Sequence, residues 1–160
     1  MKHWVLTLLL AAASLSLSAQ GEEDFASRYM KLYAEGTSLT CSTVSPQMMA
    51  RVMNVAEADN DPHLRQVLSQ MKSLRVVRSG KPEESGPLYE KALSLLHHNA
   101  QRYQPYGDSD AEDGEGLWVR RKGEVILEIV LLSHSAAEGM SIVDLTGNMD
   151  DTFIVELLRL

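Results

Sequence analysis

A single acidic residue, Glu128, stands inside an otherwise apolar run from Val125 to Leu132. A carboxylate buried in a strand is unfavourable unless it is paired with a cation or accepts hydrogen bonds. Such a group can bind a ligand or exchange protons, but structural ion pairs place carboxylates in the same surroundings. We favour structural pairing, with a partner among the arginines of the other predicted strands, namely Arg75, Arg78, Arg120 and Arg121.

Two adjacent histidines, His97 and His98, are candidate metal ligands, because imidazole is a common ligand of transition metals. Consecutive residues of a helix point about 100° apart, so the two rings cannot easily hold one ion. Helical metal sites place their histidines four residues apart instead. Both side chains also fall outside the apolar stripe of the helix predicted around them. We therefore expect two solvated histidines.

Five acidic residues cluster between Asp108 and Glu115, and calcium prefers carboxylate oxygens as ligands. The cluster begins like a calcium-binding loop, with Asp108 and Asp110 at the first and third positions. Its glycine comes one position too late, and Val119 stands where such a loop needs a bidentate glutamate. We expect a solvated acidic loop, with specific calcium binding as the alternative.

The sequence lacks the residue patterns typical of a catalytic site. His134 lies between two serines and precedes Asp144, but no G-x-S-x-G turn is present to expose a nucleophile. A glycine-rich phosphate loop and an H-E-x-x-H motif are also absent. Cys41 has no lysine or arginine near it in sequence to activate its thiol, and we expect it to be buried. The sequence therefore predicts no catalytic residue, no cofactor and no metal.

Composition excludes several classes of function. The chain has 160 residues and a formal charge of −7, whereas a nucleic-acid-binding protein needs a basic face. Its 44% hydrophobic content is that of a globular protein, and its length fits one domain. Its single cysteine excludes an internal disulfide and a cysteine-based zinc site.

The first residues predict a secretory signal peptide. Lys2 provides a basic start, an apolar run follows from Trp4 to Leu17, and small residues precede Gln20. The apolar run is shorter than the ~20 residues that a membrane-spanning helix needs. We expect residues 1–19 to be removed, and residues 20–160 to form a single exported domain without a transmembrane span.

The rest of the chain predicts an α+β fold. Apolar residues recur with helical spacing near 22–35, 45–56, 62–71 and 85–102, and again in a short stripe after Asp150. Extended segments are predicted at 39–44 and 72–77. The C-terminal third predicts a three-stranded antiparallel meander, with strands at Leu117–Arg121, Glu124–Ser133 and Met140–Thr146.

The expected architecture is an antiparallel sheet that ends in this meander, with helices packed on one face. The middle strand, Val125–Leu132, is apolar at nearly every position, whereas a strand with one wet face should alternate. Either both faces of the sheet are covered, or one face is used for association.

Several short motifs occur in a fixed order along the chain. Ser45-Pro46 precedes Met48-Met49, the strand 72–76 follows, and the C-terminal third adds the glutamate-bearing strand 125–132 and the closing segment 142–150. Together they resemble the Bacteroidota family catalogued as domain of unknown function 4252. The resemblance implies an exported protein, periplasmic or associated with the outer membrane of a Gram-negative bacterium, with a role in envelope signalling. It implies no catalytic residues, because none are established for the family.

These observations favour a non-catalytic exported domain that binds a partner protein or a second copy of itself. The apolar middle strand and the lack of a catalytic set of residues motivate this hypothesis. Two alternatives stay open. One is a small-molecule-binding enzyme that uses Glu128, and the other is a binding module that calcium stabilises at the loop containing Asp108 and Asp110.

Overall fold

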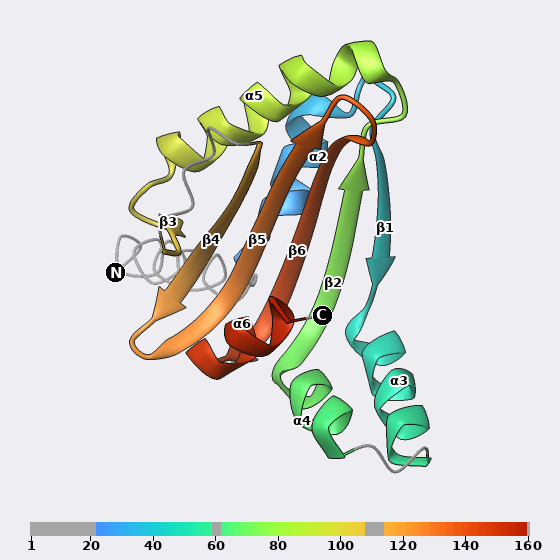
Figure 1. Cartoon of the computed structure of the whole chain (residues 1–160), viewed down its shortest axis with the longest axis vertical. Helices are drawn as coiled ribbons and strands as arrows, with labels where there is room; N and C mark the ends of the chain where they lie inside the picture. Colours follow the sequence, from blue (N-terminus) through green and yellow to red (C-terminus); the bar gives the residue numbers. More distant parts are fainter. Residues whose placement is uncertain (1–21, 59–61, 108–113, 160) are drawn as a thin grey trace, which may run out of the picture.

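The computed structural model describes residues 22–58, 62–107 and 114–159. Within these residues the chain forms an open antiparallel sheet of six strands, in the order β1-β2-β6-β5-β4-β3 (Figure 1). The α+β class is confirmed, and so is the C-terminal meander of β4, β5 and β6. The strands are β1 Thr40–Val44, β2 Met71–Arg78, β3 Gln104–Pro105, β4 Glu115–Lys122, β5 Val125–Ser135 and β6 Gly139–Met149.

Two of the helices begin after an aspartate that satisfies a free backbone N–H group. Asp24 caps the helix that begins at Phe25, and Asp150 caps the helix that begins at Asp151. In each case the carboxylate accepts a hydrogen bond from the backbone N–H three residues later. The longest helix begins at Pro82 and not at the predicted Ser85, because proline fits the first helical turn. The helices are α2 Phe25–Tyr33, α3 Pro46–Ala58, α4 Pro62–Gln70, α5 Pro82–His98 and α6 Asp151–Leu157.

Helices α2 and α5 cover one face of the sheet, which we call the first face (Figure 1). Their apolar side chains pack against alternate residues of the central strands, including Val130 of β5 and Ile142 of β6. Tyr29 of α2 is fully buried, and its hydroxyl donates to the carbonyl of Leu88 in α5 at 2.7 Å. This core therefore joins α2 to both the sheet and α5.

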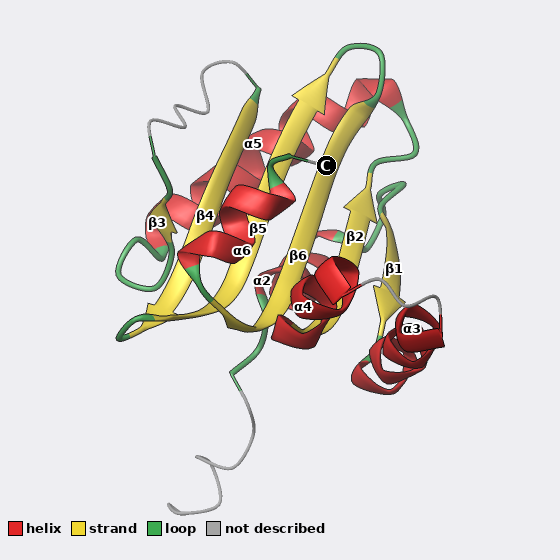
Figure 2. Ribbon diagram, turned by 60° about the horizontal axis from the view of Figure 1, so that its bottom comes forward, coloured by secondary structure: helices red, strands yellow, loops and turns green. Residues whose placement is uncertain are grey.

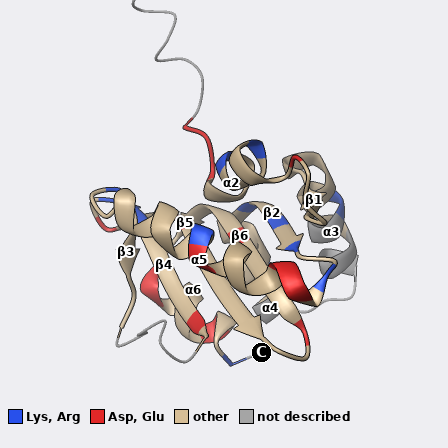
Figure 3. Ribbon diagram, turned by 90° about the horizontal axis from the view of Figure 1, so that it is seen from above, with Lys and Arg blue, Asp and Glu red and all other residues tan. Residues whose placement is uncertain are grey.

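The opposite, second face carries α4 and α6, so the expectation that helices pack on one face only is wrong. Figure 3 shows α2 on one side of the sheet and α4 and α6 on the other. A second core joins Phe153 and Ile154 of α6 to Ile129 of β5. Because β5 sends Ile129 to this core and Val130 to the other, its sequence is apolar at nearly every position. Of the two explanations offered for that strand, coverage of both faces is the one observed.

Helices α4 and α6 are short, and they cover only part of the second face. They lie over the end of the sheet near the β4–β5 turn (Figure 2). Among the described residues, no helix covers the other ends of β4, β5 and β6 on this face; these ends lie at Glu115, Ser135 and Gly139 (Figure 2). The second face thus has a covered end and a bare end.

Within the described ranges, the outer strand β1 pairs with β2 alone. Its residues from Thr40 to Thr43 are exposed, and Cys41 is exposed among them. The expectation that Cys41 is buried is therefore wrong, because the residue lies on the outermost strand and not in a core layer. Along the described part of the chain, no helix is long and apolar enough to cross a lipid bilayer.

Candidate functional site

Glu128 is completely buried on the first face, beneath the start of α2. One carboxylate oxygen accepts a hydrogen bond from the backbone N–H of Phe25 at 2.6 Å, and the other accepts one from Nε of Arg120 at 2.7 Å. The hydroxyl of Tyr103 lies 3.1 and 3.2 Å from the two oxygens. Burial and the charge of Glu128 raise the pKa of Tyr103, so its hydroxyl stays protonated and donates. Glu128 is thus both ion-paired and fully hydrogen-bonded.

Asp144, on the neighbouring strand β6, is almost completely buried next to Glu128. Its Oδ2 accepts a hydrogen bond from the N–H of Ala26 at 2.7 Å, and Asp24 accepts one from the next N–H along α2 at 2.8 Å. The first N–H groups of a helix have no partner within the helix. Three successive N–H groups, at positions 25–27, therefore each bind a different carboxylate. We call Asp24, Glu128 and Asp144 the acid cluster.

Arginines balance the acid cluster where it approaches solvent. Nε of Arg75 lies 2.9 Å from Asp24, and Arg120 contacts Glu22 at 2.7 Å with a second guanidinium nitrogen. The positive end of the α2 dipole also favours negative charge on the acid cluster. With its charge balanced by the arginines and the helix dipole, the acid cluster holds the start of α2 against the sheet.

The pKa of Asp144 lies well above its usual range. Burial is the largest cause, because it disfavours the charged form, and the negative charge of Glu128 adds to it. The hydrogen bond from Ala26 acts in the opposite direction. Asp144 therefore keeps its proton at pH values where an exposed aspartate has lost it.

Replacement of Asp144 by asparagine is expected to remove a pH-dependent cost of folding. The unfolded chain loses this proton near pH ~4, whereas the folded chain holds it to higher pH. Between these values the unfolded state binds fewer protons, so the contribution of Asp144 to stability falls as pH rises. The amide of Asp144→Asn keeps one acceptor and one donor without titrating. We expect the variant to gain stability relative to the wild type between pH 4 and 7.

Urea unfolding of both proteins at several pH values in this range measures the difference. The control is Asp151→Asn, since Asp151 is exposed and has its pKa lowered by a hydrogen bond from Arg121. That variant should differ from the wild type by a constant amount over this range, because a lowered aspartate pKa changes stability with pH only below about pH 4. A progressive loss by Asp144→Asn over the same range would contradict the account of Asp144.

The acid cluster provides no open site for acid–base chemistry. Glu128 is 0% exposed, and each of its oxygens already accepts hydrogen bonds. A general acid or base needs to reach the substrate proton within hydrogen-bond distance. The contacts of Glu128 instead match the structural pairing favoured from the sequence, with Arg120 as the partner among the four arginines considered.

The two histidines lie at the C-terminal end of α5 and are both exposed. Nδ1 of His98 lies 2.7 Å from the carbonyl oxygen of Ser94, one turn earlier. Within the described residues, no group of three or more histidine, cysteine or acidic side chains is arranged to hold a metal ion. Asp108 and Asp110, the candidate calcium ligands, lie outside the described residues.

The residue types of a hydrolytic triad are not brought together. Nε2 of His134 lies 3.2 Å from Oγ of Ser85, whose hydroxyl also donates to the carbonyl of Pro82. Ser85 is buried, and the ring of Tyr89 lies 5.2 Å from that of His134, centroid to centroid, in a tilted arrangement. Asp144 belongs to the acid cluster instead. His134 therefore ties β5 to the first turn of α5.

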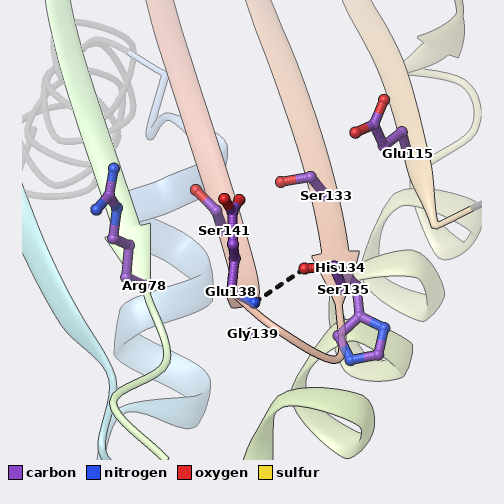
Figure 4. A pocket seen from close by; sticks show the side chains of 8 residues that line it. All are labelled: Arg78, Glu115, Ser133, His134, Ser135, Glu138, Gly139 and Ser141. Carbon is purple, nitrogen blue, oxygen red and sulfur yellow. Dashed lines mark hydrogen bonds between the residues drawn. The ribbon is translucent and has the colours of Figure 1, made fainter. Parts of the chain in front are cut away.

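The bare end of the second face carries a row of polar residues. The strand register places four residues side by side across four strands, and we call them the polar row: Arg78 of β2, Ser141 of β6, Ser133 of β5 and Glu115 of β4. They line a cavity of about 460 Å³, with Glu138 and Ser135 at its rim (Figure 4). Among the described residues, no side-chain partner satisfies any of the four. As far as the described residues extend, the polar row is open to a ligand.

A second row of residues lies between the polar row and α6. It contains Val76, Val143 and Leu131, which pair across β2, β6 and β5 and are only partly buried. We call these three residues the apolar row. The bare end of the sheet thus combines unpaired polar groups with apolar surface, which is typical of a binding site.

Sequence reasoning missed the polar row and the role of Asp144. The row arises because β2 pairs with β6, which follows it by about 60 residues in the chain. Aligning the ends of the predicted strands would reveal the polar row only if the pairing of β2 with β6 were already known. Asp144 did show a signal, since it is a single acid inside a predicted strand, as Glu128 is.

Comparison with known proteins places the chain in one family. Neither the curated proteins nor the solved structures contain a match. A family model described as "Domain of unknown function (DUF4252)" matches residues 33–157. The match includes Glu128, Asp144 and the whole polar row, whereas α2 lies almost entirely before it. Because the match covers most of the chain, the chain belongs to the DUF4252 family.

Proposed function

We propose that the chain is a non-catalytic binding module of the cell envelope, which holds a partner protein at the bare end of its second sheet face. The observation that carries the proposal is the polar row beside the apolar row. One arginine, one glutamate and two serines stand there without side-chain partners among the described residues. Polar groups that border apolar surface supply both specificity and affinity in a protein interface.

The proposal includes export. The signal-peptide pattern of residues 1–19 supports it, and the family resemblance supports a periplasmic or outer-membrane-associated location. In such a compartment the partner is an envelope protein, and a role in envelope signalling fits. The mass of the protein recovered from the cell envelope tests the export step, since cleavage as predicted leaves Gln20 as the first residue.

Site-specific crosslinking tests the binding surface. A photoreactive amino acid is placed at Ser141, in the centre of the polar row, and the protein is produced in its native host. The matched control carries the same amino acid at Glu90, an exposed residue of α5 on the first face. We expect a discrete crosslinked partner from position 141, identified by mass spectrometry, and none from position 90.

Two outcomes would contradict the proposal. Equal products from both positions would show that the bare end of the sheet has no special role. The lack of any product from position 141, while the exported protein is present and folded, would show that nothing binds there.

A further inference from the structure

We propose that the polar row binds an extended peptide segment of the partner that carries an acidic and a basic side chain four residues apart. This inference rests on the proposed function and names the chemistry of the bound segment. The segment runs across the strands, with its acidic side chain at Arg78 and its basic side chain at Glu115. Its central side chain lies over the serines and the apolar row.

The charges of the row define the two ends of the segment. Arg78 and Glu115 are exposed residues on the two outermost strands of the row (Figure 4). A guanidinium binds a carboxylate with two hydrogen bonds, and a carboxylate binds an ammonium or guanidinium in the same way. Glu138 adds a second negative charge to the rim of the cavity. A ligand with charge of both signs therefore satisfies the row, whereas a neutral glycan leaves both ends unpaired.

The spacing of the strands sets the distance between these charges. Neighbouring strands lie about 4.8 Å apart, so the three intervals between β2 and β4 separate Arg78 from Glu115 by about 14 Å. An extended chain rises about 3.3 Å per residue, and four residues span about 13 Å. Residues i, i+2 and i+4 of an extended chain point to the same side. Opposite charges at i and i+4 therefore face both ends of the row together.

The centre of the row suits the middle of such a segment. Ser133 and Ser141 present hydroxyls that can donate to and accept from the peptide backbone. Leu131 and Val143 lie one row nearer to α6 and are partly exposed, so they offer contact to a small apolar side chain at i+2. Both features fit an extended segment better than a helix, because a helix has already paired its backbone groups.

A second copy of this chain is a poorer occupant. Within the sequence, each pair of opposite charges four residues apart includes a residue of α2, a residue of α4 or Arg120. The helical residues are not extended, and Arg120 is bound to Glu128. The segment is therefore expected to come from a different protein.

A synthetic peptide tests the inference with the purified protein, residues 20–160. The probe is a capped heptapeptide with the order glycine, aspartate, threonine, valine, threonine, lysine, glycine. The control peptide has the same composition but places aspartate and lysine next to each other. Binding is followed by NMR, from the amide signals of Ser133 and Ser141. We expect the probe to shift these signals and to bind at least fivefold more tightly than the control peptide.

Variants of the chain complete the test. Arg78→Gln and Glu115→Gln should each weaken binding of the probe at least threefold, whereas Glu90→Gln should leave it unchanged. Equal binding of both peptides, binding unaffected by Arg78→Gln, or no shift at millimolar probe would each overturn the inference. A crosslinked second copy from position 141 would also overturn it. A specific envelope partner crosslinked from position 141 would still support the proposed function in any of the peptide outcomes.

Discussion

Replacing Glu128 by glutamine is expected to lower the free energy of unfolding by roughly 3–5 kcal/mol, the usual cost of breaking a buried ion pair. The change removes the charge that Arg120 pairs with at 2.7 Å. It also places an amide N–H where the carboxylate accepts from Phe25, Tyr103 or Arg120, so one buried donor loses its acceptor. The free energy of unfolding of a domain is only about 5–15 kcal/mol, so this loss would be a large part of it.

Urea unfolding at pH 7 measures the loss. The matched control is Glu90→Gln on α5, where the side chain is exposed and the expected change is within about 0.5 kcal/mol. Hydrogen exchange of the α2 amides adds a second readout. In Glu128→Gln, the contacts between the acid cluster and α2 should open locally before the sheet unfolds. A loss below about 1 kcal/mol for Glu128→Gln, with α2 still protected, would contradict the structural role of the acid cluster.

Replacing Gly147 by alanine is expected to cost roughly 3 kcal/mol, at the upper end of the usual penalty for overpacking. Gly147 lies on β6 opposite Met71, next to a register shift in β2. A Cβ atom there would overlap the backbone carbonyl oxygen of Gln70. Backbone atoms cannot move aside as a flexible side chain can, so the contact between β2 and β6 must open.

The matched control is Gly86→Ala in α5, where an added Cβ meets no atom within 4 Å. Alanine favours the helix, but the following Pro87 restricts the residue before it, so the net change should stay within about 1 kcal/mol. Thermal unfolding of the two variants gives the comparison. If Gly147→Ala proved at least as stable as Gly86→Ala, the result would contradict the close contact between Gly147 and the backbone of Gln70.

Much of the fold follows from local sequence patterns. The meander was predictable because β-branched and apolar residues fill three successive segments separated by glycine-containing turns. The position of α6 on the second face was not predictable. Its seven residues form too short a periodic pattern to show which face of the sheet they cover. The exposure of Cys41 depends on the strand order, which places β1 at the edge.

The candidate sites divide in the same way. Glu128 could be identified because one charge interrupts an apolar strand, and Arg120 was one of four partners considered. That α2 supplies Phe25 N–H as a third contact needed the tertiary structure. The polar row was invisible in sequence, because serines and single charges near strand ends are common and only the register aligns them.

The acid cluster and the polar row lie in different surroundings, and we assign them different roles. The acid cluster is buried, is ion-paired through Arg75 and Arg120, and holds α2 on the first face. The polar row is open, has no side-chain partner among the described residues, and lies on the second face. Changing an exposed residue of the polar row should therefore alter binding without altering stability. Arg78 is exposed and outside both cores, so it is the residue at which the two effects separate best.

The most direct measurement is the yield of crosslinked partner from position 141 when Arg78 is replaced by glutamate. Arg78→Glu reverses the charge at one end of the polar row, and the unfolding temperature of the variant is recorded alongside. We predict that the yield falls at least fivefold while the unfolding temperature changes by less than about 2 °C, as for other surface substitutions. An unchanged yield from a folded Arg78→Glu protein would contradict the assignment of the polar row as the binding surface.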